Sequence, residues 1–518
     1  MMKARGKRAT GLAMAMMMAS TMMPTMQVHA EDAEWYKSID TSDEVNLVFY
    51  VCGNAPEDKD VVEDAVNEIL KEKINTTIEF QFSTWTDWSQ KYALALTGGT
   101  ADLIYTANFV NYQTYATSGA FLELDDLMET YAPDILEAVA PEALEQCKVM
   151  DSLYCIPNTW KEYSSLGILY REDLRKKYDL PVPDSLENIE AYLLGIKEND
   201  PSQGLLGIGT GESTGLNRGF DIMSVFNMKY NWVKGDGLMY GLGATYDNPS
   251  EIIDYWNSPD YLEDLKLVKK WADEGLWSRS VLSDPSDSED FNNGTVVMKV
   301  AGMNPNKCIT AVNKFEKDGK GWEAAYITYG ELTGSLYPNA PTSNATSITR
   351  SCKNPERALM VLDLLLTDPE LNELIQCGIE GVHYELDEDG VYTNLSEAYG
   401  YEGMNTWNLR NGDLKLPQKS DVLLQEMFDR YEEIGNKTKT PNINISSGFS
   451  EDYTSYATER SAVRQVMDEY LAPLEAGLVD DPEEALAVFL EKVEKAGLST
   501  CREAYISQWE AYCEKHGY

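Results

Sequence analysis

The chain has 518 residues, of which 43% are hydrophobic and 25% are charged, and its net charge at pH 7 is −43. This length exceeds one ordinary hydrophobic core, so we expect two lobes of roughly 200 residues each. The composition excludes a disordered or collagen-like chain, and the negative charge excludes nucleic acid as a partner and opposes binding to anionic lipid.

The first thirty residues are predicted to be a secretory signal peptide. Basic residues between Lys3 and Arg8 precede the apolar run 12–26, and Val28-His29-Ala30 supplies a small-residue cleavage site. Polar residues and Pro24 interrupt the apolar run, which is shorter than the roughly 20 residues of a membrane span. We therefore expect an exported, strongly acidic mature protein that begins near Glu31.

Cysteine and histidine are too sparse or too scattered for a metal site. The eight cysteines include no CxxC pair, which argues against a zinc site and against a disulfide-built miniprotein. Export permits disulfides without proving them. Only His383 and His516 remain after cleavage, so we expect no metal and no cofactor.

The first half of the mature chain alternates strands and helices. The expected elements are a strand at 45–51, a helix at 58–73, a strand at 76–82, a helix at 88–96 and a strand at 102–105. This alternation predicts a mostly parallel sheet. Ligands bind beyond the carboxyl ends of such strands, which points to the loops near Asn54, Ser83 and Thr106.

A second α/β unit follows Pro157, and no internal repeat is present. Its expected elements are strands at 166–170, 205–208 and 295–300 and helices at 186–197 and 261–274. Later come helices at 355–366, 423–434, 461–474 and 482–496 and a hairpin turn at 387–390.

Several phrases resemble, in the same order, those of the extracellular solute-binding proteins related to maltose-binding protein. They are 102–108 (DLIYTAN), 115–124 (YATSGAFLEL), 153–157 (LYCIP), 167–173 (GILYRED), 291–294 (FNNG) and 353–359 (KNPERAL). The phrases 379–384 (IEGVHY), 474–477 (LEAG) and 482–484 (PEE) resemble the longer, lipoprotein-like Gram-positive branch. The ordered set covers nearly all of residues 44–515 and is far more specific than any one phrase.

The resemblance implies an α/β, two-lobed periplasmic-binding-protein-like fold of type II, with a ligand cleft between lobes built from mostly parallel sheets. It places the first lobe at 44–160 plus 326–386 and the second at 161–325 plus 387–518, with rotation about 157–163 and Ile327. It implies a monomeric receptor that hands a small polar solute to the permease subunits of an ABC importer by lobe closure. Many members carry a lipid-modified cysteine at the signal boundary, yet no cysteine precedes Cys52 here.

A sugar or oligosaccharide is the favoured ligand, with a peptide or another polar solute left open. Sugar pockets need flat apolar faces together with a few fixed amides and carboxylates. Aromatic and asparagine residues gather where the loops are expected, and the resemblance implies a ligand-facing loop at Asn304. The candidate ligand contacts are Asn54, Trp85, Trp88, Asn108, Phe109, Trp160, Tyr163, Asn304, Trp407 and Phe449.

Each of these aromatic residues is equally compatible with a packing role, and Glu380 is compatible with a turn or a pocket. Trp256, Trp271 and Trp277 lie at or near a helix and are expected in the core. Replacing Trp160 with alanine is expected to lower ligand affinity while the fold is kept.

An exported hydrolase is the alternative function. Residues 211–215 (GESTG) fit the GxSxG pattern, with Ser213 as a nucleophile and His383 as its only sensible base, but no oxyanion segment accompanies them. A glycosidase carboxylate pair cannot be selected from 86 acidic residues. Residues 387–390 (DEDG) lack the spacing of a calcium loop. We assign no catalytic residue and expect a binding protein rather than an enzyme.

Overall fold

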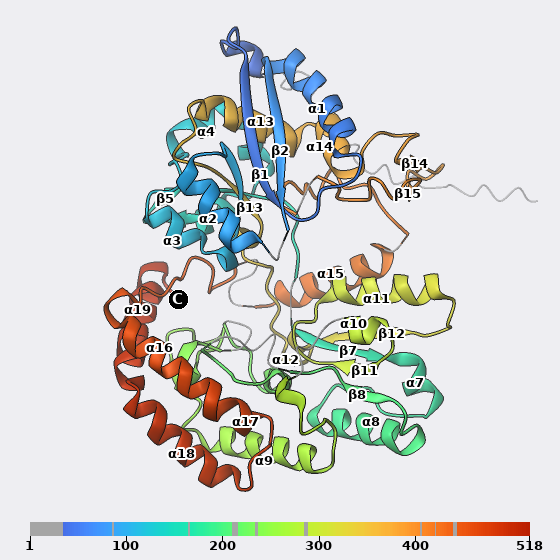
Figure 1. The fold of residues 1–518 in the computed structure, drawn as a ribbon, viewed down its shortest axis with the longest axis vertical. Coiled ribbons are helices and arrows are strands. Elements are labelled where there is room, and N and C mark those ends of the chain that lie inside the picture. Colours follow the sequence, from blue (N-terminus) through green and yellow to red (C-terminus); the bar gives the residue numbers. More distant parts are fainter. Residues whose placement is uncertain are drawn as a thin grey trace, which may run out of the picture.

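The computed structural model shows two lobes stacked along the long axis of the molecule (Figure 1). It describes residues 35–84, 87–163, 166–209, 216–233, 237–283, 289–404, 407–419, 421–438 and 443–518. The expected signal peptide, Trp85 and Ser213 lie outside these ranges. Within the described part of the chain, no helix combines the length and the apolar character of a membrane span.

The first lobe is built on a five-stranded sheet in the order β2-β1-β3-β13-β6. Its strands are β1 (Val45–Cys52), β2 (Thr76–Ser83), β3 (Leu103–Thr106), β6 (Ile156–Pro157) and β13 (Ala345–Ile348). Its helices are α1 (Lys59–Ile74), α2 (Trp88–Gly98), α3 (Tyr112–Thr117), α4 (Asp125–Tyr131), α5 (Pro133–Ala138), α6 (Pro141–Gln146), α13 (Pro355–Thr367) and α14 (Pro369–Cys377). Two hairpins complete it, namely β4 (Lys148–Val149) with β5 (Ser152–Leu153) and β14 (Tyr384–Leu386) with β15 (Tyr392–Asn394).

The apolar pattern of the sequence explains how these helices attach to the sheet. On α1, Val62, Val66 and Leu70 recur every four residues and are buried, as expected for one face of an amphipathic helix. The interior of α13 is buried on all sides, because α4, α5 and α14 pack around it. The expected hairpin turn at 387–390 is confirmed between β14 and β15.

The second lobe contains a four-stranded sheet in the order β12-β7-β11-β8 and a larger share of the helices. Its strands are β7 (Gly167–Arg171), β8 (Gly204–Leu206), β11 (Val296–Lys299) and β12 (Ala324–Thr328), with a small pair β9 (Leu242–Gly243) and β10 (Ile253–Asp254). Its first helices are α7 (Glu172–Lys177), α8 (Leu186–Asn199), η3 (Asp221–Met228), α9 (Pro259–Asp273), α10 (Glu289–Asn292), α11 (Pro305–Asp318) and α12 (Tyr329–Thr333). Its later helices are α15 (Asp421–Gly435), α16 (Ala457–Val466), α17 (Ala472–Glu475), α18 (Pro482–Lys495) and α19 (Leu498–His516).

The two sheets differ in strand direction. Strands β1, β2 and β3 are parallel, as the alternation in the sequence predicts, whereas β13 and β6 add antiparallel pairs. In the four-stranded sheet of the second lobe, β8 and β11 pair in parallel, whereas β7 runs opposite to both of its neighbours, β11 and β12, and pairs with them antiparallel. The two-lobed α/β architecture is nevertheless the expected one.

Within the described residues, three segments cross between the lobes, at 158–163, 337–344 and 410–419. They are hydrogen-bonded to one another, since Asn339 N donates to Glu162 O (2.7 Å) and Thr159 N donates to Arg410 O (3.1 Å). The three crossing segments, here called the hinge, therefore lie side by side.

Two crossings lie later in the chain than the expected boundaries at 326 and 387. Ile327 pairs with Ile168 inside the second-lobe sheet. The chain therefore returns to the first lobe only after β12 has ended. Tyr399 and Leu409 are still part of the first-lobe core, which moves the last crossing beyond Leu409.

The side chains that the sequence assigns to the core lie there. Trp256 and Trp271 are fully buried in the second lobe, and Trp277 is nearly so. All eight cysteines are described, buried and free.

Candidate functional site

The carboxyl ends of β1, β2 and β3 form one edge of the first lobe. Asn54 follows β1, Thr84 follows β2, and Asn108 and Phe109 follow β3, and all four residues are exposed. They lie on one edge because the three strands are adjacent and parallel. Residues 108–110 contact the crossing segment at 341–343, so this edge faces the second lobe.

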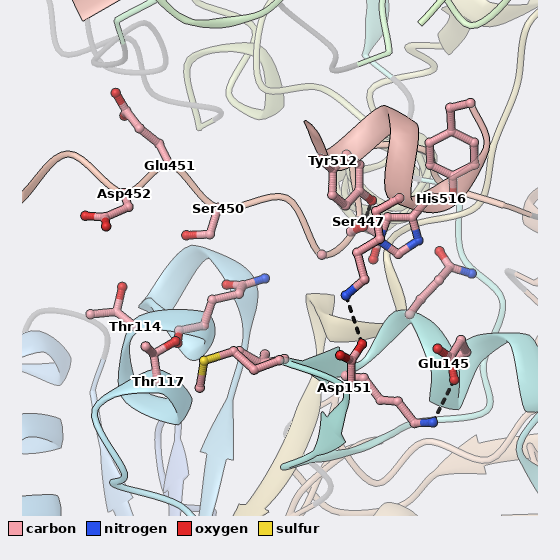
Figure 2. A pocket seen from close by; sticks show the side chains of 18 of the residues that line it. Thr114, Thr117, Glu145, Asp151, Ser447, Ser450, Glu451, Asp452, Tyr512 and His516 are labelled. Atoms are coloured by element: carbon pink, nitrogen blue, oxygen red, sulfur yellow. Dashed lines mark hydrogen bonds and ion pairs between the residues drawn. The ribbon is translucent and has the colours of Figure 1, made fainter. Parts of the chain in front are cut away.

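A cavity of about 770 Å³, here called the front cavity, lies between the two lobes beside this edge. The first lobe supplies one wall from α3, α6 and the β4–β5 turn, and the second lobe supplies the other from residues 447–454 and the end of α19. In Figure 2, Ser450 and Asp452 lie across from Thr114 and Thr117 of α3. Its size falls within the range of roughly 300–1,000 Å³ typical of small-molecule sites.

Direct contacts join the two walls of the front cavity. Lys515 Nζ at the end of α19 pairs with Asp151 Oδ1 of the β4–β5 turn at 2.8 Å (Figure 2). A β-carbon added at Gly448 would lie 3.8 Å from the carbonyl oxygen of Gln146. Any rotation of the lobes therefore changes the width of this cavity.

The front cavity contains polar atoms that the fold leaves without partners. Ser447 Oγ and Gln146 Oε1 are buried, and neither has a hydrogen-bond partner among the described residues. Ser447 is only 6% exposed, and both residues line the cavity. An unsatisfied buried polar group costs about 1–3 kcal/mol. A ligand hydroxyl that forms a hydrogen bond with one of these atoms would remove that cost.

The charges of the front cavity are mostly negative, and two of them are paired with lysines. Lys515 lowers the pKa of Asp151, and Glu145 raises the pKa of Lys148. Burial lowers the pKa of His516. Since the lining includes five carboxylates against two lysines and His516, the cavity disfavours an anionic ligand.

A smaller basin of about 180 Å³ lies within the second lobe and is lined by aromatic and amide side chains. The rings of Tyr230 and Trp232 stack with centroids 4.4 Å apart, and Tyr246 stacks on Tyr337. The sequence interpretation missed this aromatic basin because it examined loops after strands, whereas Tyr230 and Trp232 follow η3. The aromatic-amide run 230–232 (YNW) is the signal that could have indicated it.

Trp160, Asn304 and Trp407 are brought together in a third space, here called the back cavity, of about 480 Å³. Its centre is an ion-pair network: Arg410 binds Glu402 through two hydrogen bonds of 2.5 and 2.9 Å and binds Glu162 at 3.0 Å. Burial disfavours the charged form of Arg410, but the two glutamates outweigh this and raise its pKa.

Trp160 is covered by cations in the back cavity. The Arg410 guanidinium lies 4.9 Å from the ring centroid, and Lys415 Nζ lies 4.0 Å from it. Asn304 caps α11, accepting a hydrogen bond from Lys307 N (2.9 Å). A space of about 550 Å³, lined in part by Trp160 and the crossing segments, lies between the back and front cavities.

Three further candidates lie in packed surroundings, which corrects their expected position on the cleft surface. Trp88 is 4% exposed and stacks on Tyr50, because α2 turns its indole into the sheet. Tyr163 is 3% exposed and packs on the aromatic residues of α15. Phe449 contacts Trp509 with ring centroids 4.9 Å apart.

Of the residues considered for catalysis, Ser213 lies outside the described residues and His383 lies in the first-lobe interior. His383 is fully buried in the first lobe, where its Nδ1 accepts a hydrogen bond from Ile379 N (2.9 Å) and Nε2 lies 3.3 Å from Asp58. Within the ranges that the structure describes, no group of three histidine, cysteine, aspartate or glutamate residues could hold a metal.

Comparison with known proteins gives one extensive family match. The model described as "Bacterial extracellular solute-binding protein" matches residues 55–370. A second model, a domain of unknown function (DUF3502), matches residues 445–514.

Individual proteins resemble the chain over most of its length. It is 23% identical over 472 residues to a "Carbohydrate ABC transporter substrate-binding protein" of Streptococcus pneumoniae serotype 4, covering 89% of each chain. It is 25% identical over 315 residues to lipoprotein LipO of Bacillus subtilis, covering 56% of this chain and 59% of that one. Its fold is similar to the crystal structure of the N-glycan transport solute-binding protein NgtS of S. pneumoniae, with a TM-score of 0.73, 21% identity and coverage of 91% and 99%.

Proposed function

Because the chain belongs to the bacterial extracellular solute-binding protein family, we propose that it captures a neutral oligosaccharide between its lobes and delivers it to an ABC importer. The observation that carries this proposal is the front cavity, a space of about 770 Å³ with one wall from each lobe. The relative from S. pneumoniae carries the name of a carbohydrate transporter component, and structures of NgtS contain Man1GlcNAc or Man5GlcNAc.

The chemistry of the cleft supports a sugar. Hydroxyl-bearing residues of α3 and of the opposite loop, together with unpaired Ser447 Oγ and Gln146 Oε1, match ligand hydroxyl groups. Phe109 and the aromatic basin supply flat apolar surface for the C–H faces of sugar rings. The excess of carboxylates favours a neutral sugar over a uronate or sialylated one.

In this proposal, closure of the lobes tells the importer that a ligand is bound. Asn54, Asn108 and Phe109 are exposed on the first lobe, so a ligand that reaches both lobes gains contacts only when they approach each other. Its higher affinity for the closed form shifts the open–closed equilibrium. In this proposal the protein is a monomer, and the permease subunits of the importer recognise the closed form.

Calorimetry with a glycan panel tests the proposal. The panel contains Man1GlcNAc, Man5GlcNAc, kestose, alginate oligosaccharides and a set of short peptides, and each incubation is also examined by product chromatography. We expect binding of at least one neutral glycan without turnover and a smaller radius of gyration at saturation. A ligand at a hundred times its Kd should stabilise the fold by about 2.7 kcal/mol.

Three outcomes would contradict the proposal. If the protein binds only peptides, its ligand is not a carbohydrate. If the incubations release products, the protein is a hydrolase. If the radius of gyration at saturation is unchanged, the lobes do not close on the ligand.

A further inference from the structure

We propose that Cys147 and Cys155 form a disulfide bond in the exported protein and so cross-link the base of the β4–β5 hairpin. In this structure both residues are free, buried thiols of the first lobe. The chain belongs to an extracellular protein family, and disulfides form and persist outside the reducing cytosol. The inference concerns a covalent modification of the first lobe, so it does not depend on the identity of the ligand.

The two cysteines flank the β4–β5 hairpin. Cys147 directly precedes Lys148, which pairs with Leu153 across the hairpin, and Cys155 follows Leu153 by two residues. Paired strands lie about 4.8 Å apart, and a disulfide joins residues whose Cα atoms are about 4.4–6.8 Å apart. The register of the hairpin therefore brings the two cysteines onto neighbouring backbones at a suitable spacing.

The side chains of the pair meet in the interior of the first lobe. The Cys147 thiol lies within hydrogen-bonding reach of the Cys155 thiol, and both residues are fully buried. The hydroxyl of Tyr112 on α3 lies beside the Cys155 thiol and donates to Cys147 O at 2.6 Å. Because the two thiols already face each other, rotations about side-chain bonds are enough to bring the sulfur atoms to bonding distance.

Other cysteines that share a helix or a sheet lie too far apart to pair. Cys501 and Cys513 are both on α19 but are more than three helical turns apart along it. In the first lobe, Cys52 ends β1 at the carboxyl edge of the sheet, whereas Cys352 lies beside Asp102, which precedes β3 at the opposite edge. A disulfide cannot span such distances.

The β4–β5 hairpin is short and strained, so a cross-link at its base has a structural use. Each of its strands contains 2 residues, and a hairpin of this kind is marginally stable by itself. Its turn residues Met150 and Asp151 have φ values of 50° and 67°, a left-handed conformation that is costly for residues other than glycine. The bond would hold in place the turn whose Asp151 pairs with Lys515 of the second lobe.

The bond forms while the first lobe folds after export. Burial raises the pKa of the Cys147 thiol well above its ordinary value, so the folded protein holds little of the thiolate that attacks a disulfide. The oxidant is the disulfide of an extracytoplasmic thiol oxidoreductase. One cysteine thiolate attacks it, forms a mixed disulfide and releases one of its thiols. The second cysteine thiolate then displaces the other, so the protein loses two hydrogen atoms and the oxidant becomes a dithiol.

Thiol counting tests the proposal on the full chain, exported to the oxidising periplasm of a bacterial expression host. The protein is denatured and alkylated with iodoacetamide, with or without prior reduction, and its intact mass gives the number of alkylated cysteines. Of the eight cysteines, all should be alkylated after reduction and all but two without it. Trypsin cleaves after Lys148, so the bond should join peptide 92–148 to peptide 149–161.

Thermal unfolding with and without a reductant separates a disulfide from simple packing. For the wild type, reduction should lower the Tm by roughly 5 °C, because it removes the constraint that the bond places on the unfolded chain. The Tm of the double variant Cys147→Ala/Cys155→Ala should not respond to reductant. Cys501→Ala, which removes a buried cysteine of the second lobe, is the matched control and should respond as the wild type does.

Two results of the thiol count would overturn the proposal. One is alkylation of all the cysteines without reduction, and the other is a cross-linked peptide that contains a cysteine other than this pair. If the wild-type Tm does not respond to reductant, the bond does not stabilise the hairpin as proposed. Since none of these measurements uses a ligand, their outcome is independent of whether the protein binds a sugar.

Discussion

The front and back cavities lie on the same boundary between the lobes, yet they are built in opposite ways. In the back cavity, Arg410 is 8% exposed and satisfied by two glutamates, and cations cover the Trp160 ring. In the front cavity, Met150 and Tyr453 are exposed, and Ser447 Oγ has no partner among the described residues. Internal pairing indicates a hinge, whereas unused groups indicate a place for a ligand.

The network around Arg410 joins both lobes to the hinge. Glu162 on the first crossing segment also accepts a hydrogen bond from Asn306 Nδ2 of α11 (2.7 Å). The back cavity therefore joins the two lobes through side chains that are already paired with one another.

Removing Arg410 should have the largest effect. Arg410→Ala leaves Glu162 and Glu402 close together and unpaired, and we expect a loss of about 3–5 kcal/mol in the free energy of unfolding, measured by urea titration. Arg410→Lys should recover only part of it, because one ammonium cannot bind Glu402 through two bonds.

Lys515→Ala is the corresponding change in the front cavity. Lys515 and Asp151 have side chains 57% and 82% exposed, so the Tm should not change measurably. An equal decrease in Tm for both alanine variants would remove the distinction between the two cavities.

The buried carboxyl of Glu475 should make the free energy of unfolding depend on pH. Burial raises the pKa of Glu475 to about 7, from an ordinary value of 4.5, so the folded protein binds this proton more tightly than the unfolded chain does. The resulting stabilisation, about 3 kcal/mol, is fully present below pH 4.5 and is lost as the pH rises through about 7.

Glu475→Gln should remove this pH dependence. The free energy of unfolding of the wild type, relative to that of the variant, should fall between pH 4.5 and 7 in urea titrations. Glu469→Gln, at an exposed position shortly before Glu475, serves as the control, and its stability should depend on pH as that of the wild type does. Parallel curves for the wild type and Glu475→Gln would show that this carboxyl does not titrate as described.

Trp160→Ala gives the most discriminating effect. Because Arg410 and Lys415 already occupy its surroundings, Trp160→Ala should cost about 1–2 kcal/mol of stability and change glycan affinity by less than about twofold. This reverses the expectation from sequence, in which affinity falls and the fold is kept. A clear loss of affinity at an unchanged Tm would place Trp160 in the ligand site after all.

The sequence by itself determined the α/β architecture and one edge of the cleft. Alternating strands and helices predict β1, β2 and β3, and parallel neighbours necessarily bring Asn54 and Asn108 to the same edge. Local order along the chain contains this information, because the direction of a parallel strand fixes where its following loop lies.

Only the tertiary structure decided which side chains face the cleft. Trp88 and Phe109 both occur near strand ends, yet the first is 4% exposed and the second 59%, because the orientation of α2 about its axis depends on packing against the sheet. The front cavity joins residues 113–118 and 142–151 to residues 447–518. No local pattern links segments so far apart in the chain, since their meeting depends on how the two lobes pack across the hinge.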